Sequence, residues 1–297
     1  MVSLVKGSAR DQVHRIAVAA AVKASEWALR VPALRDVFLE QLLRRLRTAH
    51  ETYEPDLAAR THVEFFGRHL EPFLHRLLSE RPAAGRAILR FLGAWILDVQ
   101  KRTETQWAGC NATPVTVVIE PTDRCNLNCP GCYARSTRDG SDLPYEVMRQ
   151  IVQQVVELGT TLVTLSGGEP FLRERADGTI TRLAERYSDR GFLVYTNGTL
   201  IDDSMARRLS RLGNIFPAIS VEGNEHQTDA RRGRGTYDTD RRVRALLRKH
   251  AVMTGFSATI TRQNCEAICT DDFLDMRIDE GDLFGWFFLL QPIGRSP

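Results

Sequence analysis

Three closely spaced cysteines, Cys125, Cys129 and Cys132, give this chain its clearest capacity for metal chemistry. They form a Cys-x3-Cys-x2-Cys pattern directly after the apolar run 115–119. Thiolates are the ligands of iron–sulfur clusters, and a fully ligated [4Fe–4S] cluster takes four of them. No fourth cysteine stands in this segment, so three thiolates would leave one iron open to bind another molecule. The spacing therefore favours a catalytic centre over a structural one.

Two further segments could serve the same centre. Gly167 and Gly168 have no side chains and suit a place where the backbone approaches a ligand closely, and Glu169 offers an anionic acceptor for an ammonium group. Asn197 precedes a glycine in a common turn pair, and its amide can recognise a small polar group. A tight turn explains either segment taken alone.

The strands and helices that must position these residues can be predicted from the spacing of apolar residues, which changes near Thr113. From there short β-branched runs alternate with amphipathic stretches, which predicts parallel strands joined by helical crossovers. The predicted strands are 115–120, 161–166, 192–197, 218–222, 255–261 and 286–291, and the predicted helices lie near 145–158, 180–188, 203–212, 239–249 and 271–278. This span of about 177 residues is too short for an eight-stranded barrel, which takes around 250. We expect an α/β domain over residues 113–297, a partial six-stranded (β/α)6 parallel barrel.

Residues 1–112 have a different pattern. Apolar residues recur three and four apart from about Asp11 to Arg102, with breaks at prolines, which predicts an all-α N-terminal domain of three or four helices. The apolar face in the stretch 65–78 is typical of packing within such a domain. The helix near 16–29 carries flanking basic residues and could make peripheral contact with a membrane, although soluble bundles have the same pattern.

The predicted barrel brings the polar motifs to one edge of its sheet. In parallel α/β barrels the functional groups collect on loops after the carboxyl ends of the strands. The cysteines follow the first predicted strand, the Gly-Gly-Glu segment follows the second, Asn197 ends the third, and Ser220 lies in the fourth. Asp123, Glu222 and Thr259 belong to the same mouth. We therefore expect a single site there.

With these motifs the chain resembles the radical S-adenosylmethionine enzymes over roughly residues 115–291. The resemblance rests on the cysteine triad after the first strand, the Gly-Gly-Glu loop after the second and the strand-four segment 219–223. Within the family the core is most similar to the MoaA and anaerobic sulfatase maturase type. The cysteine-rich C-terminal extension of many such members is lacking here, so we expect a lipid-like or small-metabolite substrate, with peptide or protein modification as the alternative.

The resemblance implies a radical mechanism. Cys125, Cys129 and Cys132 would ligate three irons of a [4Fe–4S] cluster, and the fourth iron would take the amino and carboxylate groups of S-adenosyl-L-methionine (SAM). One electron from the reduced cluster would cleave SAM and give a 5′-deoxyadenosyl radical that abstracts hydrogen from the substrate. An electron donor such as flavodoxin or ferredoxin is the implied partner.

The same resemblance assigns residues to SAM. The Gly-Gly-Glu loop would contact the methionine ammonium, and the strand-four serine with one of two arginines would hold the carboxylate, for which a guanidinium fork is well shaped. The tyrosine after the third cysteine stands where the family places an aromatic near the adenine. The implied cofactor-binding residues are Tyr133, Gly167, Gly168, Glu169, Asn197, Ser220, Arg231 and Arg232.

Other metal-binding functions remain open from the residues alone. A structural zinc site would need a fourth ligand, and the next histidine downstream is the distant His226, whereas zinc ribbons supply paired ligands at both ends. A non-catalytic iron–sulfur redox sensor would share the cysteines but would not need the Gly-Gly-Glu loop. Cys110, Cys265 and Cys269 could form an auxiliary cluster, but free cysteine commonly behaves as a small buried hydrophobe.

Composition narrows the classes further. The 297 residues are 43% hydrophobic and 26% charged, which is typical of globular domains. The net charge of +3 gives no general signal for nucleic acid. We interpret the arginine-rich segment 231–249 as a solvated helix face, with attraction of an anionic substrate as the alternative. The first residues lack the features of a secretory signal and no apolar run approaches about 18 residues, so we expect a cytoplasmic protein.

Overall fold

The computed structural model describes residues 37, 40, 41, 43, 44, 70–89, 114 and 116–295. The chain divides into two compact units, and the second comprises residues 80–87 and 113–297. The predicted helix near 16–29, its proposed membrane contact and Cys110 lie outside the described residues. Helix α4 (Glu71–Glu80) is described, with Leu74 and Leu77 buried, while the all-α character of residues 1–112 as a whole stays a prediction.

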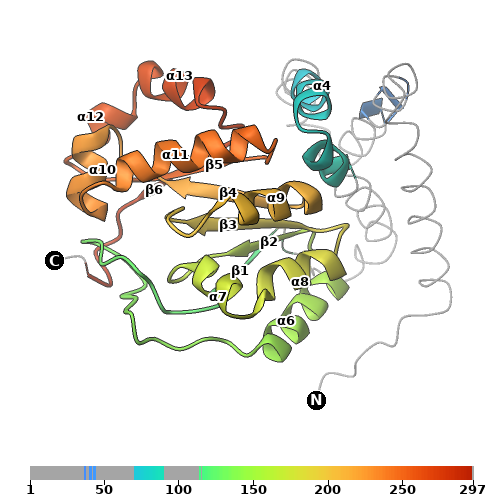
Figure 1. Cartoon of the computed structure of the whole chain (residues 1–297), viewed down its shortest axis with the longest axis horizontal. Coiled ribbons are helices and arrows are strands. Elements are labelled where there is room, and N and C mark those ends of the chain that lie inside the picture. The colour runs from blue at the N-terminus through green and yellow to red at the C-terminus, as the bar shows by residue number, and fades with distance from the viewer. Residues whose placement is uncertain are drawn as a thin grey trace, which may run out of the picture. The chain divides into compact units, whose positions relative to one another are not determined.

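The second unit is built on a six-stranded sheet whose strands lie side by side in chain order (Figure 1). All neighbouring strands are parallel, which confirms the predicted partial six-stranded α/β barrel. The strands are β1 (Thr116–Ile119), β2 (Leu162–Leu165), β3 (Gly191–Thr196), β4 (Ile215–Ser220), β5 (Gly255–Ile260) and β6 (Gly285–Leu289).

Helices return the chain from each strand to the next. They are α6 (Tyr145–Glu157), α7 (Pro170–Asp177), α8 (Thr179–Arg186), α9 (Asp203–Leu212), α10 (Glu225–Arg232), α11 (Thr236–Lys249), α12 (Cys265–Ile268) and α13 (Asp271–Asp279). Four of them match predicted helices closely, and α11 begins three residues before the predicted start. In the described part of the chain, no helix combines the length and apolar character needed to cross a bilayer.

The sequence-based prediction missed α7, α10 and the four-residue α12, and it began β4 three residues late. Helices α7 and α10 have only eight residues each. The starts of α7 and α10 are nevertheless encoded locally. Pro170 is the first residue of α7, and the side chains of Asn224 and Gln227 form a capping box at α10. Strand β4 contains Pro217, which lacks an N–H group. It is tolerated because β4 pairs there only with β3, and pairing with β5 begins at Ala218.

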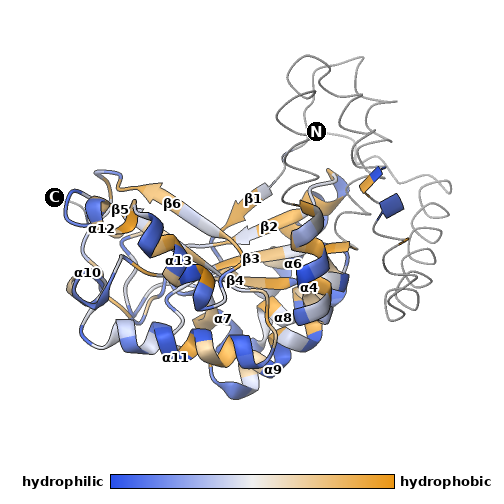
Figure 2. Cartoon of the chain, turned by 90° about the horizontal axis from the view of Figure 1, so that it is seen from above, coloured by the Kyte–Doolittle hydropathy of each residue, from blue (hydrophilic) through white to orange (hydrophobic). Residues whose placement is uncertain are grey.

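One face of the sheet packs against the helices (Figure 2). Alternate strand residues such as Val163, Val194 and Ile219 enter a core with Met148 of α6 and Leu247 of α11. Because successive side chains of a strand point to opposite faces, the residues between them lie on the other face of the sheet, called here the inner face. The inner face and the carboxyl ends of the strands carry the candidate site.

Candidate active site

The three cysteines lie on one long loop between β1 and α6, residues 120–144, called here the cysteine loop. The loop folds back on itself. The Cys125 N–H donates to the carbonyl of Thr137 at 2.8 Å, and the Arg124 guanidinium makes a bidentate pair with Asp142 at 2.9 and 2.6 Å. The first cysteine is therefore held by backbone and ionic contacts on both sides.

All three thiols are free and half-buried. Burial raises the pKa of Cys125 to about 11; the N–H of Leu127 opposes this, and the charges of Glu169, Cys129 and Cys132 add to it. The other two thiols therefore lie within electrostatic range of Cys125. A bound metal ion deprotonates a coordinating thiol, so these three ligands suit a cation-bearing group.

The arrangement fits a cluster in which each cysteine binds a different iron, because such ligands need not converge on one atom. Within residues 70–89 and 116–295 and the few described residues before them, no three His, Cys, Asp or Glu side chains are placed to hold a single metal ion. Three thiolates on one loop are suited to three irons of a [4Fe–4S] cluster.

The two glycines of the Gly-Gly-Glu loop are required by the cysteine loop itself. A Cβ atom on Gly168 would lie 2.0 Å from the carbonyl oxygen of Arg124, and Gly167 has a positive φ of 95°. Backbone hydrogen bonds join the segments here: Gly168 donates to Thr122 at 2.9 Å, and Glu169 donates to Arg124 at 2.8 Å. The glycines thus bring the ends of β1 and β2 into direct contact.

The Glu169 carboxylate is buried and holds neighbouring elements together. It caps α7 by accepting from the N–H of Phe171 at 3.1 Å. It also accepts from the hydroxyl of Thr196 and the N–H of Asn197, both at 2.7 Å. Burial is the largest cause of its raised pKa, opposed by these hydrogen bonds. Whatever contact it makes with SAM, Glu169 links the end of β2 to the end of β3.

The Asn197 side chain connects β3 to the cysteine loop. Its amide donates to Asn126 at 2.9 Å, and its carbonyl accepts from the Thr199 hydroxyl at 2.6 Å. Asn126 in turn donates to Thr199 at 2.8 Å. Sequence reasoning missed Asn126, although its place directly after Cys125 was a signal.

Tyr133 is anchored by its hydroxyl group. The hydroxyl donates to Glu120 at 3.0 Å, lies 2.8 Å from the Ser166 hydroxyl and accepts from the N–H of Gly167 at 3.1 Å. Burial raises the pKa of Tyr133 against the effect of Ser166 and Gly167. The residue as a whole is 47% exposed, so a fixed ring is offered beside the cysteines and the Gly-Gly-Glu loop.

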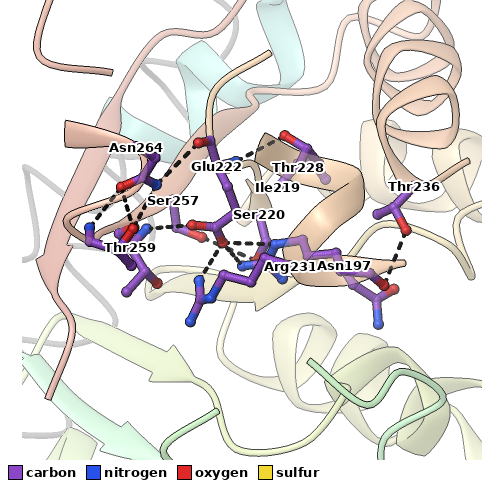
Figure 3. Close-up of polar contacts among 12 residues, drawn as sticks. Asn197, Ile219, Ser220, Glu222, Thr228, Arg231, Thr236, Ser257, Thr259 and Asn264 are labelled. Atoms are coloured by element: carbon purple, nitrogen blue, oxygen red, sulfur yellow. Dashed lines mark hydrogen bonds and ion pairs between the residues drawn. The ribbon is translucent and has the colours of Figure 1, made fainter. Parts of the chain in front are cut away.

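Both candidate arginines reach the site, and both pair with Glu222; Figure 3 shows the pair with Arg231. Arg232 donates through Nε to the Glu222 carboxylate at 2.9 Å, and Arg231 donates to the carbonyl of Pro130 in the cysteine loop at 3.3 Å. Burial opposes the charged form of Arg232, but Glu222 and Cys129 outweigh it and raise its pKa. The arginines are therefore adjacent to the second cysteine.

Glu222 is a positioning residue that sequence reasoning placed at the mouth without a role. Its side chain is 1% exposed, and the N–H of Thr259 donates to it at 3.2 Å. Its backbone is held by Thr228 at 3.1 Å and Asn264 at 3.1 Å (Figure 3). Ser220 lies two residues earlier, 3.3 Å from the hydroxyl of Ser257 on β5.

The inner face carries aromatic side chains on β3 and β6. Val194 enters the helix-side core, so its neighbour Tyr195 lies on the inner face. Phe288 of β6 packs edge to face against Tyr195, with ring centroids 5.4 Å apart. Trp286 lies two residues before Phe288 and therefore on the same face of β6. Burial and the charge of Tyr133 raise the pKa of Tyr195 to about 12. The aromatic face thus begins near the tyrosine beside the cysteines.

Two predictions outside this site need correction. Cys265 and Cys269 lie one helical turn apart at α12, but Cys269 is exposed. The expectation that these cysteines are buried hydrophobic residues is therefore wrong for Cys269.

The arginine-rich segment 231–249 is not uniformly solvated either. Arg244 is 2% exposed and pairs with Asp240 at 2.7 Å, because α11 turns it toward the interior, while Arg241 and Arg248 remain exposed.

The sequence is similar to proteins of known families. Residues 119–261 match the family model of the Radical SAM superfamily. Fe-coproporphyrin III synthase of Methanosarcina barkeri is 31% identical over 157 residues, which are 51% of this chain and 38% of that protein. Mycofactocin maturase MftC of Mycolicibacterium smegmatis is 30% identical over 190 residues, 62% of this chain and 46% of that protein. The chain thus spans less than half the length of both relatives.

The fold has a counterpart among solved structures. Streptococcus suis SuiB, in a crystal structure with its precursor peptide SuiA, superposes with a TM-score of 0.55 at 19% identity, covering 68% of this chain and 46% of that one. At this identity the likeness concerns the fold alone. With its half-barrel, its cysteine triad and the match over residues 119–261, the chain belongs to the radical SAM superfamily.

Proposed function

We propose that the protein cleaves SAM reductively at a [4Fe–4S] cluster held by Cys125, Cys129 and Cys132 and uses the resulting radical to abstract hydrogen from a substrate. The observation that carries this proposal is the direct contact of the Gly-Gly-Glu loop with the cysteine loop, beside the two arginines that pair with Glu222. A cysteine triad alone would suit a redox sensor. A sensor has no need for an ammonium-binding loop and a carboxylate-binding cation beside the triad.

The chain's own residues would bind and orient SAM. The backbone carbonyls and carboxylate of the Gly-Gly-Glu loop would accept from the methionine ammonium. Ser220 and Arg232 would hold the carboxylate, since a guanidinium fork donates two parallel hydrogen bonds to such a group. Tyr133, with its hydroxyl anchored, would present its ring to the adenine. Asn197 would support this arrangement from the end of β3 through its contact with Asn126.

When bound, the reduced cluster supplies the one electron that breaks the sulfur–C5′ bond of SAM and gives methionine and a 5′-deoxyadenosyl radical. The protein's part is to place the substrate hydrogen near C5′ and to keep water away. A small reducing protein such as flavodoxin or ferredoxin would deliver the electron.

For the substrate we favour a small metabolite or lipid-like molecule with an apolar or planar body. The support is the aromatic inner face, where Phe288 and Tyr195 meet at 5.4 Å and Trp286 is 44% exposed. Aromatic rings bind planar and apolar groups by stacking and burial. The name of one relative, Fe-coproporphyrin III synthase, refers to a molecule of this kind. Peptide modification is the second candidate, since another relative is a maturase and SuiB binds a precursor peptide.

Anaerobic reconstitution tests the activity. The wild-type protein should bind about four irons per chain and, with dithionite, release 5′-deoxyadenosine from SAM. Cys129→Ala should do neither, whereas Cys269→Ala, which removes an exposed thiol outside the site, should behave as wild type. One bound zinc and no deoxyadenosine would refute the proposal. Adding tetrapyrroles, fatty acyl compounds or short peptides and measuring deoxyadenosine above the uncoupled rate separates the two substrate classes.

A further inference from the structure

The segment after β6 is bound to the cysteine loop, although more than 150 residues of chain separate them. Arg295 donates from its backbone N–H to the carbonyl of Cys132 at 2.8 Å and accepts from the N–H of Gly131 at 3.3 Å. These bonds attach the segment on either side of the third cysteine. Nothing in the predicted site required them.

The Arg295 side chain extends the attachment in both directions. Its Nε donates to the carbonyl of Cys129 at 3.0 Å, and its terminal nitrogen donates to the carbonyl of Ser136 at 2.6 Å. The Arg295 guanidinium thus joins Cys129 to Ser136. Since donors on a charged group make stronger hydrogen bonds than neutral ones, this side chain holds Cys129 and Ser136 together. With the backbone bond to Cys132, Arg295 contacts the backbone of both cysteines.

Position 294 requires glycine, because the backbone there lies too close to the cysteine loop for a side chain. Its φ is +70°, and a Cβ atom there would lie 2.1 Å from the Cys132 carbonyl oxygen and 2.5 Å from that of Tyr133. The Gly294 carbonyl also accepts from Nε of Arg135 at 2.7 Å. The backbone of the segment therefore lies directly on the backbone of the cysteine loop.

The loop itself needs such support. Arg135 adopts a positive φ of 50°, a conformation that non-glycine residues hold only when their surroundings over-determine it. Its N–H reaches Cys132 at a long 3.4 Å, so the turn after the third cysteine is weakly closed from within. The contacts from Gly294 and Arg295 supply the missing constraint.

We infer that Gly294 and Arg295 are positioning residues that hold the cysteine loop in its ligating conformation before the cluster binds. The charge of Arg295 has a second effect once the cluster is present, because a cation there favours the more negative, reduced cluster and raises its reduction potential. The second effect rests on the proposed function, whereas the first concerns the apoprotein alone.

Hydrogen exchange of the apoprotein tests the first effect without any cofactor. In Arg295→Ala the amides of residues 125–137 should exchange about tenfold faster than in wild type, with β2–β4 unchanged. Arg295→Lys should recover part of the protection, and Arg262→Ala, an exposed arginine after β5, should match wild type. If the variant unfolds, Gly294→Ala gives the same comparison. Unchanged exchange of residues 125–137 in both variants would overturn the inference.

Redox titration of the reconstituted protein tests the second effect. The midpoint potential of Arg295→Ala should be more negative than that of wild type, and Arg295→Lys should lie closer to wild type because the charge remains. A merely structural role would lower iron content without shifting the potential of the clusters that form. Equal potentials in the three proteins would overturn the electrostatic part, and a wild type that binds no iron would instead refute the proposed function.

Discussion

The carbonyl oxygen of Arg124 occupies the space in which a side chain at residue 168 would begin, since a Cβ atom on Gly168 would lie 2.0 Å from it. The glycine is therefore part of the contact between the cysteine loop and β2, in addition to any contact with SAM. Gly168→Ala should push the two segments apart and destabilise the protein by about 1–3 kcal/mol, the usual cost of overpacking. It should also lower the iron retained after gel filtration.

Gly235→Ala is the matched control for this change, because nothing lies within 4 Å of a Cβ atom there. It should cost only about 1–2 kcal/mol of left-handed backbone strain and leave iron binding intact. Urea unfolding and iron analysis of both variants decide the point. Full iron retention in Gly168→Ala would contradict the proposed close contact.

Glu222 should contribute strongly to the stability of the fold. Its carboxylate is buried between Arg231 and Arg232, and removing one partner of a buried ion pair leaves uncompensated charge, which costs about 3–5 kcal/mol. Glu222→Ala should lose stability in this range in urea unfolding, and Glu222→Gln less, since its amide oxygen still accepts hydrogen bonds. Equal stability of wild type and Glu222→Ala would show that the pair is not formed.

The two arginines should differ in their effect on SAM. Arg232 lies within electrostatic range of Cys129, whereas Arg231 donates to the backbone of Pro130. Loss of a hydrogen bond to a charged group costs about 1.5–3 kcal/mol, so Arg232→Met should weaken SAM binding roughly 10- to 100-fold. Arg231→Met should weaken it less. Equilibrium dialysis measures this, and decarboxylated SAM should bind wild type and Arg232→Met equally; a preserved difference would exclude a carboxylate contact.

The pair between Arg124 and Asp142 predicts a pH dependence. Burial tends to raise the pKa of Asp142, but hydrogen bonds from Arg124 and Thr122 outweigh it and hold the pKa below its usual 3.8. A lowered pKa means stabilisation that is present above pH 3.8 and is lost as the pH falls through the lower, folded-state value. The difference in unfolding free energy between wild type and Asp142→Asn should therefore be constant from pH 7 to 5 and shrink below pH 4. A difference that grows on acidification would contradict it.

The strands and most crossovers could be predicted because their information is local. Runs such as 161–166 and 192–197 alternate with amphipathic stretches, and their period alone predicts a parallel sheet with motifs at one edge. Short helices were harder. The eight residues of α10 carry few apolar side chains, so only the capping box at Asn224 signalled it.

The contacts between loops could not be predicted, because they join residues far apart in the sequence. The sequence indicates that Gly168 and Cys125 share an edge, but not that the glycine is fitted to the carbonyl of Arg124. Similarly, Glu169 reads as a free acceptor, whereas in the structure three protein donors already reach it. The bond from Arg295 to Cys129 spans 166 positions and follows no local pattern.

In the proposed binding mode, SAM binds through its amino and carboxylate groups to the one iron that the three cysteines leave open. Electron–nuclear double resonance of the reduced, reconstituted protein, with SAM carrying 15N in its amino group, tests it directly. We expect a 15N coupling to the [4Fe–4S] cluster in wild type and its loss, together with the cluster, in Cys129→Ala. An intact cluster in wild type that shows no coupling to saturating SAM would contradict it.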